Sequence, residues 1–293
     1  MKFLFLDIFY SYYYYNKNNK KNILLKHLNY KKTLTFKAFK KSKYLSLKYF
    51  NYFPIYDSLL KKFRNKKIVF VEIGVFSGGS LFMWRHFLGK KAKIIGIDLN
   101  PEIKRFKKYG FEMVIGDQSD EGFWKKFFKK YGKVDIILDD GGHTNYQQIK
   151  TVNSCVPNIR DGGFLITEDV HTSYIKDKWY NPSKYSFINY TKKLIDDLNS
   201  RYPGLKKQKF SLSKYIYSIQ YFESITVFNI NRKLSKINKE VRNNKLSTNP
   251  KEFRASLIKD SFFYKIKNFF HTKTNFTYLI FLINSFKLRN FFK

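Results

Sequence analysis

Two acidic clusters follow two short apolar segments in the middle of the chain. Both segments, residues 134–138 and 163–167, are typical of buried β-strands, and the clusters behind them are Asp139-Asp140-Gly141-Gly142-His143 and Glu168-Asp169. Strands that alternate with helices favour a parallel sheet, and ligands bind at the carboxyl ends of its strands. Carboxylates crowded at that edge repel one another unless a cation or a proton separates them. We therefore predict a chemical site here.

A glycine-rich segment, Glu72-Ile-Gly74-Val-Phe-Ser-Gly78-Gly79-Ser80, turns the first apolar run into the first helical pattern. Glycines let the backbone pass close to a ligand, and a helix N-terminus offers free N–H groups to an anionic group such as a carboxylate. The spacing is not Gly-x-Gly-x-x-Gly, and no Gly-Lys-Ser/Thr follows. These departures exclude a P-loop and make a dinucleotide fold less favoured.

Two further strand ends carry residues that suit a nucleoside. Asp98 ends the second apolar run, where an acid commonly accepts hydrogen bonds from both hydroxyls of a ribose. Gly116-Asp117-Gln118 ends the third run and is well placed to contact an adenine. A single strand-end Asp is often only a helix cap, but these motifs occur in order on successive strand ends. Together they predict a nucleoside site that includes Glu72, Gly74, Gly78, Ser80, Asp98, Asp117 and Gln118.

These motifs resemble class I S-adenosylmethionine (AdoMet)-dependent methyltransferases, and in particular the metal-dependent O-methyltransferases of macrolide and related sugars. Further motifs follow that branch in order: Asp140-Gly-Gly-His143, Asp161-Gly-Gly163, Glu168-Asp169 and Thr172-Ser173-Tyr174, with Tyr52-Phe53 and residues 218–222 as additional similarities. The resemblance covers roughly residues 49–231. It implies AdoMet as the methyl donor and a sugar or glycan-type acceptor.

Methyl transfer from a sulfonium is an in-line displacement, so the enzyme must align an acceptor oxygen and make it nucleophilic. An imidazole such as His143 can act as a general base, and a divalent cation can acidify a hydroxyl that it binds. Oxygen ligands from Asp140, Glu168 and Asp169 suit a hard ion such as Mg²⁺. The resemblance implies the same roles for these four residues.

Structural alternatives remain open for each of these residues. The Asp140 segment could be a capped turn with a solvated His143, and Glu168-Asp169 could be a strand-end pair that caps a helix. Asp139 would face the cofactor or a nearby backbone amide. His171 is an alternative base or an ordinary loop histidine. Three aromatic residues could line an acceptor pocket or pack in the core, and these are Tyr174, Trp179 and Tyr180.

The net charge of +35 invites a nucleic-acid hypothesis, but the charge lies outside the motif-bearing segment. Residues 1–67 carry 17 Lys and Arg against 2 Asp and Glu, residues 68–170 carry 15 against 13, and residues 171–293 carry 25 against 7. Lys, Asn, Tyr, Phe and Ile all have A/T-rich codons, so genomic base composition explains the bias without a selected partner. The single cysteine excludes a disulfide framework and a cysteine-rich zinc site.

The elements that position the motifs alternate between strand and helix, which predicts a doubly wound α/β sheet, mostly parallel and closed by a C-terminal β-hairpin. The expected strands are residues 67–72, 92–97, 111–115, 134–138 and 163–167, with a hairpin at 215–222 and 225–230. The expected helices lie within 45–63 and at 78–88, from 101, at 121–131, 145–159 and 183–199. We divide the chain into a basic N-terminal extension (1–45), a class I methyltransferase domain (46–231) and a basic, aromatic-rich helical extension (232–293).

Two other functions are alternatives to an O-methyltransferase: an RNA methyltransferase recruited by the basic flanks, and a non-catalytic nucleotide-fold scaffold at a membrane surface. The absence of an Asn-Pro-Pro-Tyr-type motif argues against the first, and the intact motif set argues against the second. No signal peptide or membrane-spanning run is convincing, so we expect a cytoplasmic protein. A peripheral contact of the basic C-terminal tail with the anionic inner face of the cell membrane, and oligomerisation, stay open.

Overall fold

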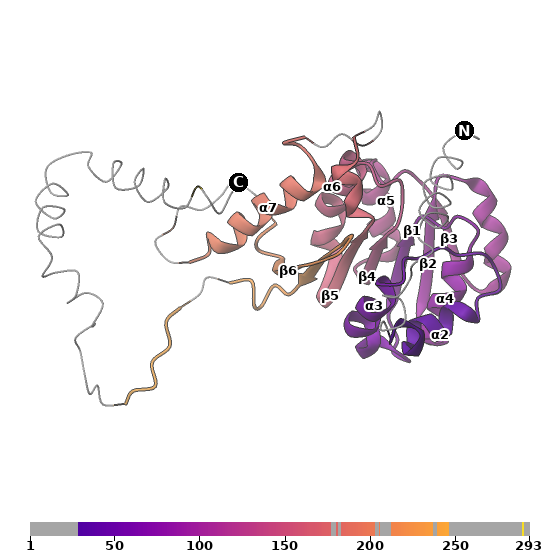
Figure 1. Cartoon of the computed structure of the whole chain (residues 1–293), viewed down its shortest axis with the longest axis horizontal. Helices are drawn as coiled ribbons and strands as arrows, with labels where there is room; N and C mark the ends of the chain where they lie inside the picture. The colour runs from indigo at the N-terminus through magenta and orange to yellow at the C-terminus, as the bar shows by residue number, and fades with distance from the viewer. Residues whose placement is uncertain are drawn as a thin grey trace, which may run out of the picture. The chain divides into compact units, whose positions relative to one another are not determined.

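The computed structural model describes residues 29–176, 180, 183–202, 205, 212–236, 239–245 and 289. In this part of the chain, seven strands form one sheet in the order β3-β2-β1-β4-β5-β7-β6 (Figure 1). The strands are β1 (Val69–Ile73), β2 (Lys93–Asp98), β3 (Glu112–Ile115), β4 (Val134–Asp139), β5 (Ile159–Glu168), β6 (Ile216–Phe222) and β7 (Ile225–Ile230). The first five pair in parallel, and β7 runs antiparallel to both of its neighbours. The predicted doubly wound, mostly parallel sheet with its C-terminal hairpin is confirmed.

The central strands are apolar on both faces because helices cover both sides of the sheet. In β1, Phe70 packs into the core on one face and Val71 into the core on the other. In β4, Ile136 and Ile137 are divided between the two cores in the same way. This is why these segments read as continuous apolar runs rather than as alternating patterns.

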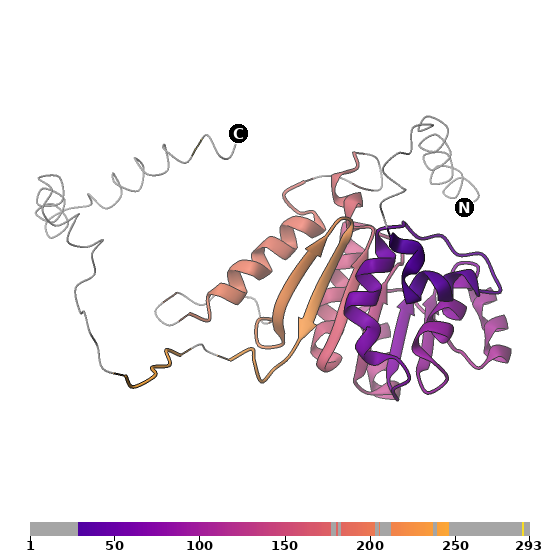
Figure 2. The same cartoon turned by 60° about the horizontal axis from the view of Figure 1, so that its bottom comes forward.

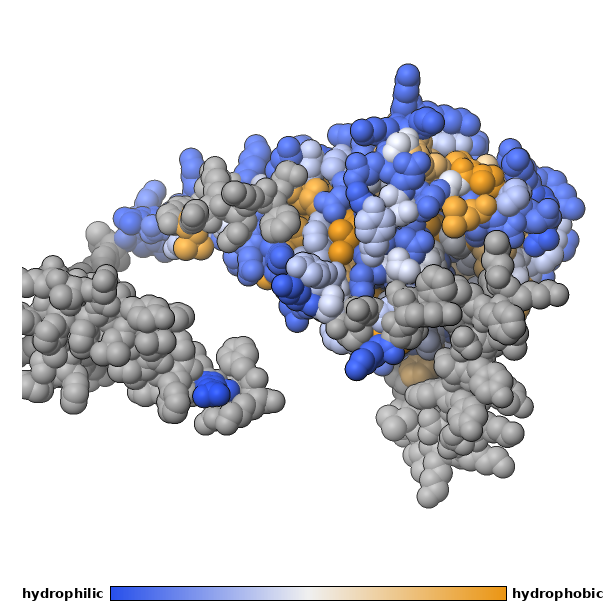
Figure 3. Space-filling model, turned by 90° about the horizontal axis from the view of Figure 1, so that it is seen from above, coloured by the Kyte–Doolittle hydropathy of each residue, from blue (hydrophilic) through white to orange (hydrophobic). Residues whose placement is uncertain are grey.

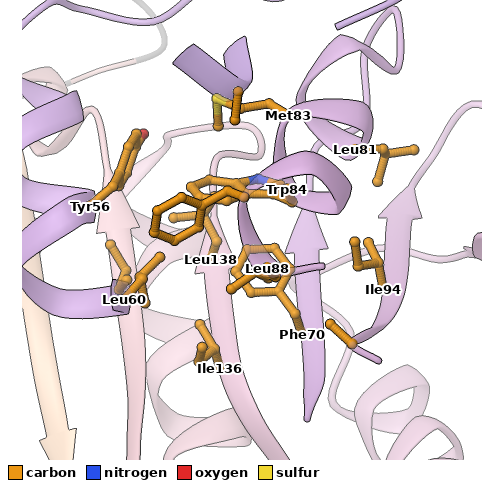
Figure 4. Close-up of a cluster of buried hydrophobic side chains, with 14 of the residues drawn as sticks. Tyr56, Leu60, Phe70, Leu81, Met83, Trp84, Leu88, Ile94, Ile136 and Leu138 are labelled. Atoms are coloured by element: carbon orange, nitrogen blue, oxygen red, sulfur yellow. The ribbon is translucent and has the colours of Figure 1, made fainter. Parts of the chain in front are cut away.

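Helices from the first part of the chain cover one face, and later helices cover the other (Figures 1 and 2). The first group is α2 (Leu34–Lys40), α3 (Tyr52–Leu60), α4 (Gly79–Leu88) and the 3₁₀ helix η4 (Pro101–Tyr109). The second group is α5 (Glu121–Tyr131), α6 (Asn145–Cys155) and α7 (Phe187–Asn199). Trp84 of α4 is fully buried at the centre of the first core, among the aromatic and aliphatic side chains drawn in Figure 4.

Several predicted element ends were wrong for local reasons. The helix predicted to run to residue 159 ends at Cys155, because Pro157 cannot continue the α-helical hydrogen bonds and a 3₁₀ turn, η5 (Val156–Asn158), follows. The strand predicted from residue 163 begins at Ile159. The helix predicted from residue 183 begins after Ser186, whose side chain accepts a hydrogen bond from the Asn189 amide.

The segment before residue 45 contributes to the first core. It contains η2 (Asn29–Lys32) and α2, and the Asp57 carboxylate of α3 accepts hydrogen bonds from the Leu34 and Thr35 amides at 2.7 and 2.9 Å. A helical N-terminal part therefore packs on the domain from residue 29 onward, and the division at residue 45 stays a prediction. Three short 3₁₀ helices complete the described elements: η3 (Lys61–Phe63), η5 and η6 (Val170–Tyr174).

The chain divides into two compact units, residues 1–239 and 240–293. In the second unit the description is confined to residues 240–245 and 289, where Arg242 pairs with Glu240 at 2.9 Å on the surface. Most of the predicted helical extension, residues 232–293, lies outside the described residues, as does Trp179. Among the described residues, no helix is long and apolar enough to cross a membrane. The face drawn in Figure 3 is mostly hydrophilic, with small separate hydrophobic areas.

Candidate active site

A pocket of about 380 Å³ opens at the carboxyl edge of the sheet. Eight of the predicted site residues line it: Gly74, Ser80, Asp98, Asp117, Gln118, Asp140, His143 and Asp169. Four others, Glu72, Gly78, Asp139 and Glu168, lie outside its lining. The structure therefore brings the nucleoside motifs and part of the acidic motif to one cavity, as the order of strand ends predicts.

The turn after β1 follows a path that requires glycine. Gly74 has φ +86°, and a Cβ there would overlap the carbonyl oxygen of Asp140. The same turn is held by Asp98, whose Oδ2 accepts hydrogen bonds from the amides of Val75 at 2.8 Å and Phe76 at 3.3 Å. The β1 turn, the end of β2 and the β4 loop thus form one close-packed floor of the pocket.

Glu72 is a buried support of this floor. Its Oε1 accepts a hydrogen bond from Trp84 Nε1 at 2.9 Å, and the residue has no exposed surface. Burial raises the pKa of Glu72 to about 7, against the opposing attraction of Lys48 and the Trp84 hydrogen bond. Its predicted contact with the cofactor stays a prediction.

Gln118 connects the end of β3 to the loop that carries His143. Its Nε2 donates to Asp139 Oδ1 at 2.9 Å and to Thr151 Oγ1 at 3.0 Å, and its Oε1 accepts from the Gly142 amide at 3.0 Å. Asp139 also accepts a hydrogen bond from the Gly141 amide at 3.3 Å. Asp139 therefore faces Gln118 and a nearby backbone amide, which is one of the two orientations that we expected.

The parallel pairing of β4 and β5 sets Asp139 beside Thr167, so the next residues, Asp140 and Glu168, emerge side by side. Between them lies the ammonium group of Lys48, 2.5 Å from Asp140 Oδ2 and 2.7 Å from Glu168 Oε2. The Lys48 side chain is only 2% exposed. Burial opposes its charge, but Asp140, Glu168 and Glu72 together raise the pKa of Lys48 above its usual value.

Two tyrosines of α3 donate hydrogen bonds to Asp169 and Glu168. The Tyr52 hydroxyl donates to Asp169 Oδ1, and the Tyr56 hydroxyl donates to Glu168 Oε1. Burial raises the pKa of Glu168 well above its ordinary value, and Lys48 opposes that rise. Both oxygens of Glu168 are thus engaged, one by Tyr56 and one by Lys48.

His143 faces the remaining carboxylate oxygens. Its Nε2 lies 3.5 Å from Asp169 Oδ2 and 3.8 Å from Asp140 Oδ1, and its Nδ1 has no hydrogen-bond partner among the described residues. His143 and Asp169 both have left-handed backbones, with φ +58° and +55°, a conformation that is uncommon outside glycine and is often found at functional sites.

This arrangement fits a metal ion at two of the three predicted metal positions, Asp140 and Asp169, with His143, which we predicted as the base, beside them. One ligand atom from each of Asp140, His143 and Asp169 lies within 4.8 Å of the others, which is a spacing that one cation can bridge. Two carboxylate oxygens and a solvent-accessible opening match the ligands that Mg²⁺ prefers. Glu168 is adjacent, but both of its oxygens already have partners. To bind the cation, Glu168 would have to release Tyr56 or Lys48, or share one oxygen between that partner and the cation.

The sequence motifs did not predict three residues that contact the acids, namely Lys48, Tyr52 and Tyr56. Their spacing of four residues was the available signal, because side chains at this spacing lie on one face of a helix. Tyr52 and Tyr56 are indeed one turn apart in α3, and Lys48 precedes the helix. His171 lies outside the pocket lining, and its Nδ1 contacts Ser224 Oγ. Tyr180 lines the pocket, whereas Tyr174 is 67% exposed and does not.

Residues 71–170 match a family model described as a methyltransferase domain. The chain is 31% identical over 156 residues to demethylmacrocin O-methyltransferase of Streptomyces fradiae, covering 50% of this chain and 39% of that protein. It is 32% identical over 128 residues to mycinamicin VI 2''-O-methyltransferase of Micromonospora griseorubida, covering 41% and 32%. The chain thus spans about a third to two fifths of the length of these relatives.

The solved structures of similar fold include the MycE methyltransferase from the mycinamycin biosynthetic pathway, in complex with Mg and SAH. The TM-score is 0.57 with 23% identity, covering 72% of this chain and 54% of that chain. At this identity the likeness shows the fold, which is that of class I methyltransferases. The resemblance to these enzymes and to the sugar O-methyltransferases among them is confirmed.

Proposed function

We propose that this chain is an AdoMet-dependent O-methyltransferase that acts on a hydroxyl of a sugar, glycan or other polyhydroxylated acceptor. The observation that carries the proposal is the position of His143 Nε2, 3.5 Å from Asp169 and 3.8 Å from Asp140, at the rim of the pocket floored by Gly74 and Asp98. A base beside acidic oxygens at the mouth of a nucleoside pocket suits removal of a hydroxyl proton during methyl transfer.

The cofactor would lie along the β1 turn, with Asp98 facing the ribose and Asp117 and Gln118 near the adenine. AdoMet supplies an electrophilic methyl group when bound, and a divalent cation lowers the pKa of a coordinated hydroxyl. Asp140 and Asp169 would hold that cation, with Glu168 as the third predicted ligand. His143 accepts the hydroxyl proton at Nε2, and the same loop aligns the acceptor oxygen.

The acceptor class is supported by the relatives, which are named as O-methyltransferases of demethylmacrocin, of mycinamicin VI and of a rhamnosyl tetracenomycin. A pocket rim with exposed Leu99 and Phe76 suits an acceptor or cofactor with an apolar part. We also propose a cytoplasmic location. Self-association and a peripheral membrane contact of the basic residues 232–293 extend the proposal, and a nucleic-acid partner is not part of it.

The decisive experiment incubates the full chain with AdoMet, Mg²⁺ and a panel of glycosides, and measures a mass increase of about 14 Da in the product. His143→Ala should lower turnover by about 100-fold or more, since a general base contributes about 10² to 10⁴. AdoMet affinity, measured by calorimetry, should change less than about threefold. His86→Ala on the exposed surface of α4 is the matched control.

Chelation tests the cation separately. EDTA should abolish product formation, and added Mg²⁺ should restore it. Full activity in EDTA would reject the cation while leaving the methyltransferase proposal intact. Absence of AdoMet binding to the wild-type chain would refute the proposed function as a whole.

A further inference from the structure

We infer that Lys48 is a positioning residue that fastens a strap of the chain, residues 42–48, across the cofactor pocket and onto the acidic site. The inference rests on the proposed function, because it concerns how the same pocket holds AdoMet. Lys48 acts through the strap and the acids, and we assign it no contact with the reacting atoms.

The strap is extended, and its residues alternate in exposure. Ser42, Tyr44, Ser46 and Lys48 are partly buried, whereas the residues between them are exposed, which is the period of two expected for an extended segment. Every second side chain therefore points towards the domain, and Lys48 is the last of these.

The first end of the strap is anchored on α4. Ser42 Oγ donates to the carbonyl of Gly79 at 2.6 Å, and a Cβ on Gly79 would overlap the carbonyl oxygens of Tyr44 and Leu45. The Tyr44 ring packs edge-on against Phe106, with a centroid separation of 5.6 Å. This close approach leaves the backbone of the strap lying on the N-terminus of α4.

The middle of the strap forms a wall of the pocket. Leu45, Ser46 and Leu47 all line it, although Leu45 is 55% exposed and Leu47 is 45% exposed. None of the described hydrogen bonds comes from residues 45–47. The strap is held before them by Ser42 and by the Tyr44 hydroxyl, which lies 2.6 Å from Tyr109 Oη, and after them by Lys48. The wall therefore depends on its anchors for its position.

The second anchor is Lys48, whose ammonium contacts Asp140 and Glu168 at 2.5 and 2.7 Å. A buried ion pair of this geometry holds the Lys48 side chain, and with it the end of the strap, in one orientation. Loss of one partner would leave a buried charge without compensation. Because Asp140 also faces His143, the ion pair links the wall of the cofactor pocket to the catalytic acids.

The test is the affinity for AdoMet, measured by calorimetry with the full chain in EDTA so that no cation contributes. Lys48→Met should raise Kd about tenfold or more, because the unfastened wall must be ordered when the cofactor binds. Lys43→Met is the matched control. It makes the same substitution on the same strap, where Lys43 is exposed and 3.5 Å from Tyr109 Oη, and it should change Kd less than twofold.

Lys48→Met also removes the positive charge beside buried Glu168 and beside Asp140, which should lower stability, so a second variant separates folding from positioning. The double variant Lys48→Met/Glu168→Gln removes both charges of that ion pair and should recover most of the thermal stability. If Lys48 positions the strap, the double variant still binds AdoMet about tenfold more weakly than the wild type. Recovery of wild-type Kd together with stability would overturn the inference, and so would an unchanged Kd in Lys48→Met. Failure of the wild type to bind AdoMet would instead count against the proposed function.

Discussion

Glu72→Gln should change how the stability of the protein depends on pH. Glu72 is completely buried beside Trp84, and burial raises its pKa from 4.5 to about 7. Below pH 4.5 the carboxyl is protonated in both the folded and the unfolded chain. As pH rises towards 7, the unfolded chain loses this proton while the folded chain keeps it, so Glu72 lowers the free energy of unfolding progressively.

The size of the effect follows from the two pKa values. A rise from 4.5 to about 7 corresponds to about 3.4 kcal/mol at about 1.4 kcal/mol per unit, and about 2.5 kcal/mol of it develops between pH 5 and pH 8.5. Glutamine cannot ionise, so the variant lacks this loss. The difference in free energy of unfolding, Glu72→Gln minus wild type, should therefore rise by about 2.5 kcal/mol over that range.

Urea denaturation at half-unit steps from pH 5 to 8.5, with EDTA present, measures this difference directly. Any pH-independent cost of the new amide group shifts the whole curve without altering its slope. Glu112→Gln is the matched control. Hydrogen bonds and the neighbouring Lys93 lower the pKa of exposed Glu112 from 4.5, so its difference should fall mainly below pH 5 and change little from pH 5 to 8.5. A Glu72→Gln curve that is flat within about 0.5 kcal/mol would refute the assignment of a raised pKa to Glu72.

Three other substitutions test the fold and the pocket by urea denaturation and calorimetry. Gly74→Ala should abolish AdoMet binding and destabilise the chain more than the control, Gly110→Ala. Gly110 has φ +79° but open space around a Cβ, so its substitution should cost about 1 kcal/mol. Equal costs for the two variants would contradict the overlap of a Gly74 Cβ with the β4 loop. Tyr56→Phe should cost about 1 to 3 kcal/mol, since it removes the donor to a buried carboxylate, and a neutral result would show that this hydrogen bond is dispensable. Leu60→Ala in the first core should cost about 2 to 5 kcal/mol, whereas Leu99→Ala at the 62% exposed pocket rim should change stability by less than about 0.5 kcal/mol; a large loss for Leu99→Ala would mean that the rim packs more tightly than its exposure indicates.

The sheet was predictable because each central strand is apolar on both faces and short, with a polar or acidic residue at its carboxyl end. Asp98, Asp139 and Glu168 come directly after such runs, so the sequence alone indicated the edge of the sheet at which the pocket opens. The helix at 121–131 was also predicted with its observed bounds, because Asp120 caps its start and Gly132 follows its end.

Element ends were less predictable where two structures compete for the same residues. Residues 156–158 continue an apolar helical pattern, yet Pro157 and the start of β5 end the helix. The nine-residue helix at Pro101 is 3₁₀, although its Asn100 cap and proline are equally compatible with an α-helix.

The sequence by itself was enough to single out the acids, the imidazole and the glycine turn as a group, because strand length and turn chemistry are encoded within a few residues. Only the tertiary structure decided which basic side chain lies between Asp140 and Glu168. Among 57 lysines and arginines nothing local distinguishes Lys48, and its partners lie 92 and 120 residues further along the chain. Burial beside two carboxylates gives this one ammonium its role, and burial is a property of the folded chain.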